Sequence, residues 1–329
     1  SAKKYVGWPL TPGFEFAGRV VAFGDREGDG EGRSDGKGDG GGNGNGEGEG
    51  KGNGDGDGNG EGDARLAVGA PVFGVTRFGG YASRVIVPRS QLFARPARLS
   101  APEAAGFLTA FLTAHYALFE LAALRPGARA LVHSAAGGVG SALLQLCRVA
   151  GVRALGVVGA AHKVGPARSF GAEAVVDKSG GGLWPAARAF APEGFDAAFD
   201  ANGHSTLRQS YRHLGPTGRL VVYGFHSMMP RRGGRPNYAA LALALLRTPR
   251  FSPLSLVGDN KAVFGFNLSY LFERGELLRA ATGRLLAWLE AGELSAPPVA
   301  LYPVERVADA HRALESGRTV GKLVLTFGV

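Results

Sequence analysis

The chain has 329 residues, of which 45% are hydrophobic, and its formal net charge is +9. That length suggests about two domains with a complete core, and the chain contains no apolar run of about 18 residues that could span a bilayer. The single cysteine, Cys147, excludes an internal disulfide. Without a C-x-x-C pair or another cluster of ligands, we expect no zinc site.

Residues 24–63 form a segment made mainly of glycine, Asp, Glu and Asn. It holds 12 acidic and 4 basic residues, so it carries −8 and leaves +17 for the remainder. Such a composition buries no apolar surface and loses much entropy on ordering, which predicts a disordered spacer. It lies between two strand-like pieces, 18–23 and 66–73, and a hairpin loop can be lengthened in this way at small cost. Its acidic residues do not follow the spacing of a calcium-binding loop.

The basic remainder raises the question of nucleic acid or an anionic membrane as a partner. Its Arg and Lys residues are scattered without a stripe or interleaved aromatic residues, so we expect no nucleic acid partner. Within 230–257, however, five arginines flank the apolar run 238–246. This segment is open to two interpretations, a peripheral membrane contact or a surface loop and helix that pack on the protein itself.

In chain order, residues 11–23 and 66–97 contain short strand patterns interrupted by Gly and Pro, which indicates a small β-rich domain. Helical periodicity begins after Ser100, a predicted N-cap, and returns from 110 to 124 until a Pro-Gly pair breaks it. Apolar runs then alternate with helices, which predicts a parallel sheet covered on both faces. Strands are expected at 130–133, 154–158, 174–176, 197–199, 220–223, 263–268 and 321–327. Helices are expected near 139–150, 164–170, 183–190, 205–214, 275–291 and 304–316.

The glycine-rich turn after the first of these strands predicts a phosphate site. Ala135, Gly137 and Gly140 stand at the spacing of G-x-G-x-x-G, with alanine in the first place. A strand, this turn and a helix together let a dinucleotide pyrophosphate rest on backbone N–H groups at the helix N-terminus. A glycine triplet alone is a weak signal, because such turns also occur for conformational reasons.

The second strand indicates which dinucleotide is bound. NAD-specific sites place an Asp or Glu about 20 residues beyond the glycines, where it binds the ribose 2′-hydroxyl. Residues 154–162 contain no acid, and Lys163 follows them. A carboxylate at this position would repel a 2′-phosphate. Its absence, together with the positive charge of a nearby lysine, favours binding of a 2′-phosphate and therefore of NADP(H). Lys178, after the third strand, is a second candidate cation, although both lysines are also compatible with ordinary surface positions.

Eight blocks in order support a family resemblance. They are PGFEFAG (12–18), FGGYA (78–82), LTAHYALF (112–119), VHSAAGGVG (132–140), FDANG (199–203), GRLVVYGF (218–225), FGFNL (264–268) and GKLVL (321–325). Through these blocks, which cover nearly the whole chain outside the acidic insert, the sequence resembles the zinc-independent medium-chain dehydrogenases/reductases of the quinone oxidoreductase type. Within that group it most resembles the branch of the synaptic vesicle membrane protein homologues.

The resemblance implies an α/β fold in which both chain ends form a GroES-like catalytic domain around a Rossmann domain, usually in a homodimer. The expected boundaries are 1–118 for the first part of the catalytic domain, 119–268 for the Rossmann domain and 269–329 for the last part. The family's first strands are missing before Ser1, so we expect the catalytic domain to be truncated at its N-terminus. A targeting signal is therefore unobservable. We expect a cytoplasmic protein, with peripheral membrane contact as the alternative.

The resemblance also assigns roles to residues by position. Thr113, Phe266, Asn267 and Leu268 would flank the nicotinamide, and Lys322 would lie near the site. Gly137, Gly138, Val139 and Gly140 would lie under the pyrophosphate, and Lys163 would meet the 2′-phosphate. Tyr223 and Gly224 would border the adenosine–ribose side. Phe14 occupies the place where zinc-dependent relatives have a histidine ligand, and phenylalanine cannot bind zinc.

The expected reaction is hydride transfer from NADPH to a quinone or an α,β-unsaturated carbonyl compound. In this reaction the cofactor supplies the chemistry and the protein supplies orientation and hydrogen-bond donors. Tyr5 is the candidate proton source, although a tyrosine in such a position also suits a packing role. His133, at a strand end, is expected to be structural, and His115 and His226 have no partner that the sequence identifies. The alternative is a nucleotide-binding protein of a membrane surface or a partner complex, with little or no catalytic activity.

Overall fold

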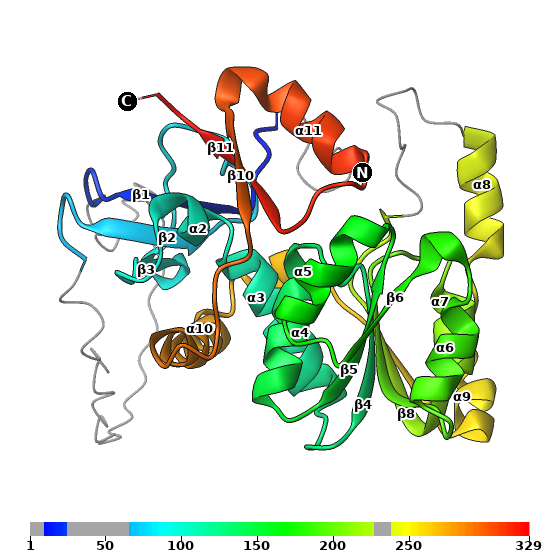
Figure 1. Ribbon diagram of the computed structural model, residues 1–329. Coiled ribbons are helices and arrows are strands. Elements are labelled where there is room, and N and C mark those ends of the chain that lie inside the picture. Colours follow the sequence, from blue (N-terminus) through cyan, green and yellow to red (C-terminus); the bar gives the residue numbers. More distant parts are fainter. Residues whose placement is uncertain (1–9, 25–65, 227–237, 329) are drawn as a thin grey trace, which may run out of the picture.

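The computed structural model describes residues 10–24, 66–226 and 238–328 (Figure 1). The predicted catalytic Tyr5 and all but the first residue of the acidic segment lie outside these ranges, as do the arginines of 231–235. Within the described residues, no helix is long and apolar enough to cross a membrane. The predicted α/β fold is confirmed, and the six-stranded and three-stranded sheets occupy separate parts of the molecule.

A six-stranded parallel sheet forms the centre of one part, in the order β6-β5-β4-β7-β8-β9. The strands are β4 (Arg129–His133), β5 (Arg153–Val158), β6 (Ala174–Asp177), β7 (Phe195–Asp200), β8 (Leu214–Val222) and β9 (Ala262–Gly265). Every neighbouring pair is parallel. These are the apolar runs expected from the sequence, as parallel strands buried on both faces require.

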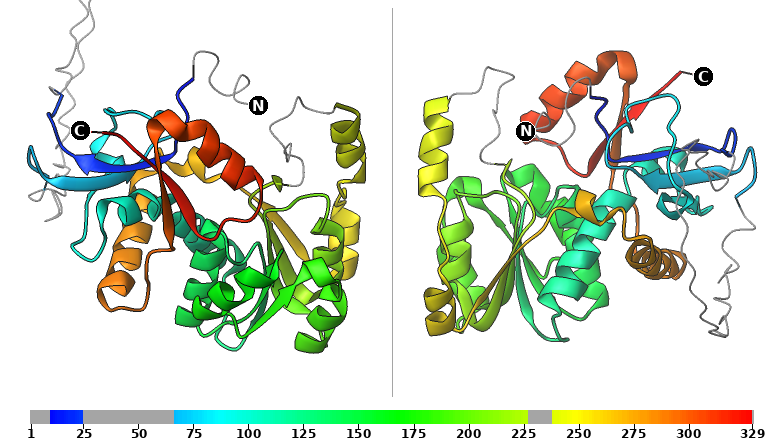
Figure 2. Two further views of the ribbon diagram at one scale, coloured as in Figure 1. Left: turned by 45° about the horizontal axis from the view of Figure 1, so that its top comes forward. Right: turned by 180° about the vertical axis from the view of Figure 1, so that it is seen from behind.

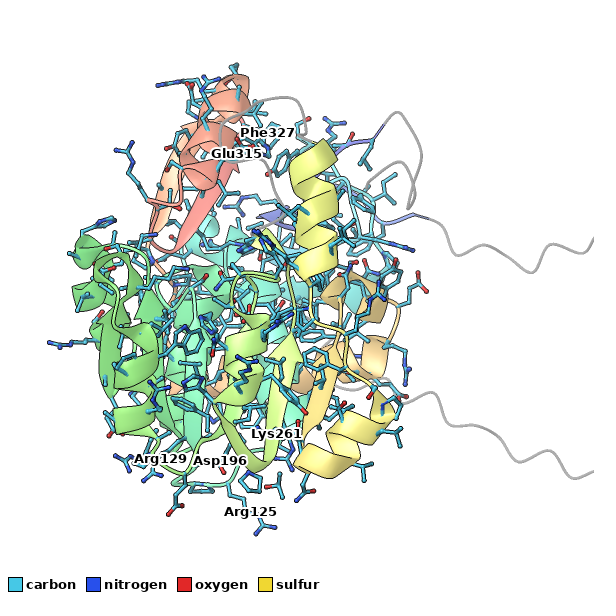
Figure 3. All side chains as sticks on the ribbon, turned by 90° about the vertical axis from the view of Figure 1, so that its right-hand side faces the viewer. Arg125, Arg129, Asp196, Lys261, Glu315 and Phe327 are labelled. Atoms are coloured by element: carbon cyan, nitrogen blue, oxygen red, sulfur yellow. The ribbon has the colours of Figure 1, made fainter. Side chains whose placement is uncertain are left out.

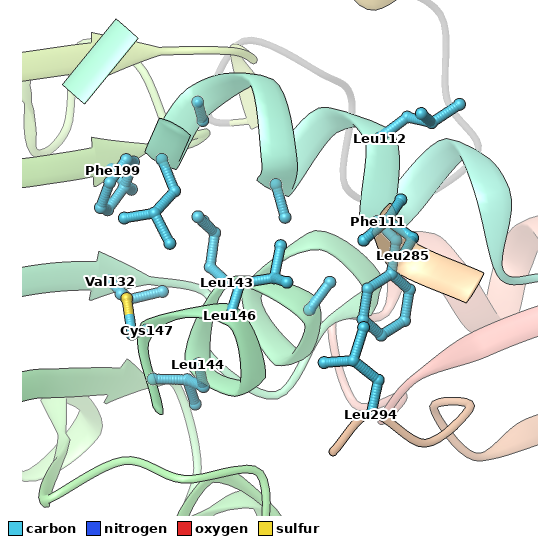
Figure 4. Packing of buried hydrophobic residues seen from close by; sticks show 14 of the residues in the cluster. Phe111, Leu112, Val132, Leu143, Leu144, Leu146, Cys147, Phe199, Leu285 and Leu294 are labelled. Carbon is cyan, nitrogen blue, oxygen red and sulfur yellow. The ribbon is translucent and has the colours of Figure 1, made fainter. Parts of the chain in front are cut away.

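Helices cover both faces of this sheet, and each face has its own apolar core (Figures 1 and 2). One core joins Ala130 and Val132 to α4 (Gly138–Val149), α5 (Val164–Ser169), α3 (Leu108–His115) and α10 (Gly275–Glu290). The other joins Leu131 to α6 (Leu183–Phe190) and α7 (Leu207–Arg212). Alternate residues of β4 thus serve opposite faces. Cys147 lies fully buried in the first core, where burial raises its thiol pKa to about 12, so it packs rather than reacts (Figure 4).

The remaining elements surround this domain. The antiparallel sheet β1-β2-β3 contains β1 (Glu15–Arg19), β2 (Pro71–Val75) and β3 (Leu92–Ala94), so the acidic segment joins two paired strands as expected. The parallel pair comprises β10 (Val299–Pro303) and β11 (Lys322–Thr326), and α11 (Val307–Glu315) packs on it. Further helices are α2 (Ala101–Ala105), α8 (Tyr238–Arg247) and α9 (Pro253–Asp259). Ser100 caps α2 in a capping box with Glu103.

Several boundaries differ from the predictions: the strand pieces expected at 18–23 and 66–73 are β1 (Glu15–Arg19) and β2 (Pro71–Val75). Strand β8 begins at Leu214 instead of 220, because a bulge between the pairs Phe195–Leu214 and Ala197–Arg219 accommodates the Gly- and Pro-containing residues 215–218. Strand β9 ends at Gly265 instead of 268, because Asn267 caps a short 3₁₀-helix, η7 (Leu268–Leu271). The helix expected at 110–124 is α3 followed by a π-helix, η3 (Tyr116–Ala122), and it ends at Ala123, which has a φ of 44°.

The two ends of the six-stranded sheet face different surroundings (Figure 3). Arg129, Asp196 and Lys261 lie at the amino ends of their strands, far from Glu315 on α11. The carboxyl ends face β11, since Gly321 N donates to Ala136 O over 2.9 Å beside the glycine-rich turn. The C-terminal strand therefore reaches the predicted phosphate site.

Candidate functional site

The carboxyl edge of the sheet between β4 and β7 is the place where a ligand is expected. The chain runs from β4 outward through β5 to β6, and then returns to the other side of β4 to form β7. At such a reversal of strand order the connecting loops diverge and leave a crevice. The residues at the ends of β4 and β7 therefore define the candidate site.

The turn after β4 has the geometry of an anion-binding helix start. Ser134 has a φ of 53°, and Gly137 is the extended N-cap of α4. The N–H groups of the first turn of a helix have no acceptor within that helix, so they are available to a phosphate. A Cβ at Gly140 would lie only 2.2 Å from Ser134 O, so only glycine permits this approach. Ala135, the alanine variant of the motif, is buried beneath the turn.

Lys322 and α3 lie in front of this turn. A Cβ at Gly138 would lie 2.7 Å from Lys322 Cδ, so the lysine stem packs directly on the glycine. Lys322 Nζ lies 2.5 Å from Glu15 Oε1, while Glu15 Oε2 accepts a hydrogen bond from Thr109 N at 2.9 Å. Thr113 Oγ1 donates to Thr109 O, one turn earlier in α3. These contacts join Thr109, Glu15 and Lys322 to the glycine turn, and Thr113 lies one turn further along α3.

Two lysines gather at the ends of β5 and β6. Burial and the charge of Lys178 lower the pKa of Lys163, so the two ammonium groups lie within electrostatic range. Lys163 Nζ donates to Gly317 O over 2.5 Å, at the end of α11. Lys178 also contributes to lowering the pKa of His133, at the end of β4. A bound phosphate would relieve the repulsion between these cations.

The other predicted residues cluster on the opposite side of β4. The ring of Phe266 lies 5.0 Å from that of Tyr116 and 6.4 Å from that of Tyr223. Asn267 Oδ1 accepts hydrogen bonds from Ser269 N and Oγ, which fixes the start of η7 and buries Leu268. Tyr223 and Gly224, at the end of β8, therefore lie with Phe266, on the other side of β4 from Lys163. The reason is the strand order, which sets β8 and β5 on opposite sides of β4.

A buried polar network at the end of β7 was missed by the sequence analysis. Asp200 Oδ1 accepts from the backbone N–H groups of Asn202 and Gly203, at 2.8 and 3.3 Å. Its Oδ2 accepts from the hydroxyls of Thr206 and Ser210, at 2.7 and 3.0 Å. The side chain of Asp200 is fully buried. The carboxylate therefore organises the loop after β7, which forms one wall of the crevice.

His133 links this network to the glycine turn. Its Nε2 lies 2.9 Å from Ser210 Oγ, and because that hydroxyl gives its hydrogen to Asp200, His133 donates from Nε2. Burial lowers the pKa of His133, so the imidazole is neutral. Next to it, Ser134 Oγ donates to Asn202 Oδ1 at 3.1 Å. His133 thus has a structural role, as its position at a strand end indicated.

Within the described residues, no group of three or more His, Cys, Asp or Glu side chains could hold a metal ion. Phe14 instead packs its ring 5.3 Å from that of Phe78. The residues around Phe14 therefore do not fit a zinc ion, and no step of the chemistry below uses one.

Comparisons with known proteins agree with this geometry. Residues 170–325 match a family described as zinc-binding dehydrogenase. The mouse synaptic vesicle membrane protein VAT-1 homolog is 31% identical over 97% of this chain and 70% of its own length. The human VAT-1 homolog-like protein, of known structure, superposes with a TM-score of 0.70 at 26% identity, over 97% of this chain and 79% of that one. The quinone oxidoreductase of Thermus thermophilus, known also in complex with NADPH, gives 0.64 at 33% identity, over 78% and 77%.

The fold and the matched proteins define the class of protein as a medium-chain dehydrogenase/reductase, a group of oxidoreductases. Within this class, the chain belongs to the family of the synaptic vesicle membrane protein VAT-1 homologues. The resemblance inferred from the eight sequence blocks is confirmed.

Proposed function

We propose that the chain binds NADPH along the carboxyl edge of the six-stranded sheet and uses it to reduce a quinone or an α,β-unsaturated carbonyl compound. The observation that carries the NADPH assignment is the convergence of Lys163 and Lys178, with no acid in 154–162. The glycine turn and α4 would hold the pyrophosphate. The complex of the Thermus relative with NADPH supports the same assignment.

The nicotinamide would lie on the β8–β9 side, where Thr113, Tyr223, Gly224 and Phe266–Leu268 border the crevice. When bound, NADPH supplies the hydride. The chain orients the acceptor and stabilises the charge that develops on its oxygen with hydrogen-bond donors in place of a metal. The ammonium group of Lys322 would attract the negative charge of the pyrophosphate at the glycine turn, and the carboxylate of Glu15 fixes the position of that ammonium group. We assign the completing proton to Tyr5.

The test of the reaction is NADPH oxidation by the full-length protein, measured by absorbance, with 9,10-phenanthrenequinone as acceptor. We expect turnover that depends on both reactants. Tyr5→Phe is expected to lower kcat with little change in the Kd for NADPH. Tight NADPH binding without any oxidation across several quinones and enones would contradict the proposed reaction and favour a binding role.

The partners follow from this proposal. The substrate is a small molecule, and we propose no nucleic acid partner. A homodimer is supported by β9, whose outer edge has no paired strand in the described residues and could accept a strand of a second copy.

A second function, contact with a membrane surface, is favoured by exposed apolar residues on α8 and α9, two helices on the same side of the molecule (Figures 1 and 2) whose exposed residues are called here the α8–α9 patch. Leu246, Leu254 and Val257 are 76%, 86% and 82% exposed on these consecutive helices. Arg247 and Arg250 are exposed beside them. Apolar side chains next to cations are the combination that binds anionic lipid surfaces. We propose a peripheral contact through this patch, compatible with the cytoplasmic location expected from the sequence.

Replacement of Leu246, Leu254 and Val257 together by serine is expected to abolish co-sedimentation with vesicles that contain an anionic phospholipid. Leu314→Ser, at an exposed position of α11, is the matched control and should leave co-sedimentation intact. If the triple variant sediments as well as the unmodified chain, the patch is not a membrane contact.

A further inference from the structure

The aromatic ring of Tyr81, in the loop after β2, is held beside the start of β1. Tyr81 N donates to Pro12 O over 2.9 Å, and Gly80 N donates to Gly13 O over 3.1 Å. A Cβ at Gly13, which has a φ of 101°, would lie 2.7 Å from Tyr81 Cδ1, so the ring lies directly on this glycine. The ring also lies 6.0 Å from that of His311 on α11. Two separate parts of the chain therefore fix the position of the phenol.

These contacts place Tyr81 next to the ion pair of Glu15 with Lys322. A Cβ at Gly80 would lie 2.9 Å from Glu15 O, so the loop that carries Tyr81 touches the first residue of β1. His311 belongs to α11, which packs on β11, the strand that begins with Lys322. Burial raises the pKa of Tyr81, the ammonium of Lys322 opposes this shift, and the carboxylate of Glu15 adds to it. The hydroxyl therefore lies within electrostatic range of both charged groups.

The ion pair connects Tyr81 to the proposed cofactor crevice. The stem of Lys322 packs on Gly138, the first residue of α4. The carboxylate of Glu15 accepts a hydrogen bond from the backbone of α3, one turn before Thr113. Tyr81 is thus joined through one ion pair to the glycine turn on one side and to the helix proposed to flank the nicotinamide on the other.

The hydroxyl of Tyr81 is suited to donating a hydrogen bond to a bound molecule. Because burial raises its pKa, the phenol keeps its proton at neutral pH. Tyr81 is only partly buried, and Phe14, which follows the glycine beneath its ring, is 43% exposed. The ring of Phe14 lies 5.3 Å from that of Phe78. An exposed aromatic surface beside a hydrogen-bond donor suits a planar ring compound that carries a carbonyl oxygen.

The proposed function leaves unnamed the donor that stabilises charge on the acceptor oxygen, and the present inference rests on that function. Hydride addition to the acceptor places negative charge on this oxygen. We propose that the hydroxyl of Tyr81 donates a hydrogen bond to it, and that the nearby ammonium of Lys322 strengthens the bond as the charge develops. The acceptor favoured by this arrangement is an aromatic quinone. The completing proton remains assigned to Tyr5.

The first test is the Tyr81→Phe variant of the full-length protein, which loses the hydroxyl and keeps the ring on Gly13. We expect kcat with 9,10-phenanthrenequinone to fall roughly 100-fold, the effect of losing one donor to a developing oxyanion, and the Kd for NADPH to stay unchanged. Tyr211→Phe is the matched control, because the hydroxyl of Tyr211 donates to Asp259 Oδ2 at 2.9 Å, beside Lys261 at the amino edge of the sheet. This control should keep both values, and thermal melts verify that both variants fold.

The second test measures quinone binding without turnover. With NADP+ in place of NADPH no hydride is available, so equilibrium dialysis reports the affinity for 9,10-phenanthrenequinone alone. We expect Tyr81→Phe to bind the quinone about three- to tenfold more weakly than the unmodified protein does, the effect of one neutral hydrogen bond. Tyr211→Phe should bind it as the unmodified protein does.

The two measurements separate this inference from the proposed function. If the unmodified protein oxidises NADPH and Tyr81→Phe has the same kcat, Tyr81 is not the donor, although the proposed reaction stands. If the unmodified protein oxidises no NADPH, the proposed reaction fails, and dialysis alone decides the role of Tyr81. Equal quinone affinities of Tyr81→Phe and the unmodified protein would overturn that role in either case.

Discussion

Replacement of Lys163 and Lys178 together by glutamine is expected to weaken NADPH binding by roughly 100-fold, while the affinity for NADH changes by less than about threefold. Hydrogen bonds to charged groups contribute about 1.5–3 kcal/mol each, and about 1.4 kcal/mol corresponds to a factor of ten. Lys163 is partly buried and therefore less screened by solvent than a surface lysine. Isothermal calorimetry with both dinucleotides in one buffer measures the two affinities.

The matched control is Lys261→Gln. Lys261 lies at the amino edge of the sheet, where its Nζ donates to Tyr211 O at 3.1 Å, far from the crevice (Figure 3). The Lys261→Gln variant should bind NADPH and NADH with the same affinities as the unmodified chain. A double variant that loses NADH and NADPH affinity equally would show that the lysines support the fold of the crevice, through contacts such as Lys163 with Gly317, and do not recognise a phosphate.

Asp200→Ala is expected to destabilise the dinucleotide-binding domain by about 4 kcal/mol or more. The change leaves two backbone N–H groups and two hydroxyls without their buried acceptor, and each such loss costs about 1–3 kcal/mol. For a unit of 150–250 residues, about 1 kcal/mol shifts Tm by about 2–4 °C, so we expect a fall of about 10 °C. Differential scanning calorimetry measures this fall directly.

Asp196→Ala provides the control on the same strand. Asp196 is exposed at the start of β7 and accepts from Arg129 N at 2.8 Å, so its loss should cost about 1 kcal/mol. Equal Tm values for the two variants would show that the network around Asp200 does not hold the crevice together.

The periodic parts of the fold were predictable from the sequence because each strand is a local apolar run. The strands expected to begin at Ala130, Ala154 and Ala174 each begin within one residue of that position. The start of β8 was not predictable, since residues 215–218 contain Gly and Pro and enter the sheet only through a bulge opposite the stretch between Phe195 and Ala197. The end of β9 was also missed, because Asn267 was treated as a strand residue and not as a cap.

The candidate site also contains some residues that the sequence predicts and others that only the structure reveals. The glycine turn and Lys163 follow strands directly, so their shared edge could be expected from chain order. The ion pair of Lys322 with Glu15 joins side chains that are 307 positions apart in the sequence, so no local sequence pattern predicts it. Asp200 was visible in a motif, but its role depends on His133, which arrives from another strand. Tyr223 lies on the β8 side of β4, a position that depends on strand order and not on any local pattern.

The proposed preference for a phosphorylated dinucleotide is tested most directly by calorimetric titration of the unmodified chain with NADPH and then with NADH. We expect saturable uptake of NADPH, at least about tenfold tighter than that of NADH, because one charge-assisted contact to the 2′-phosphate supplies that difference. No uptake of NADPH by the folded protein, or a clear preference for NADH, would contradict the account.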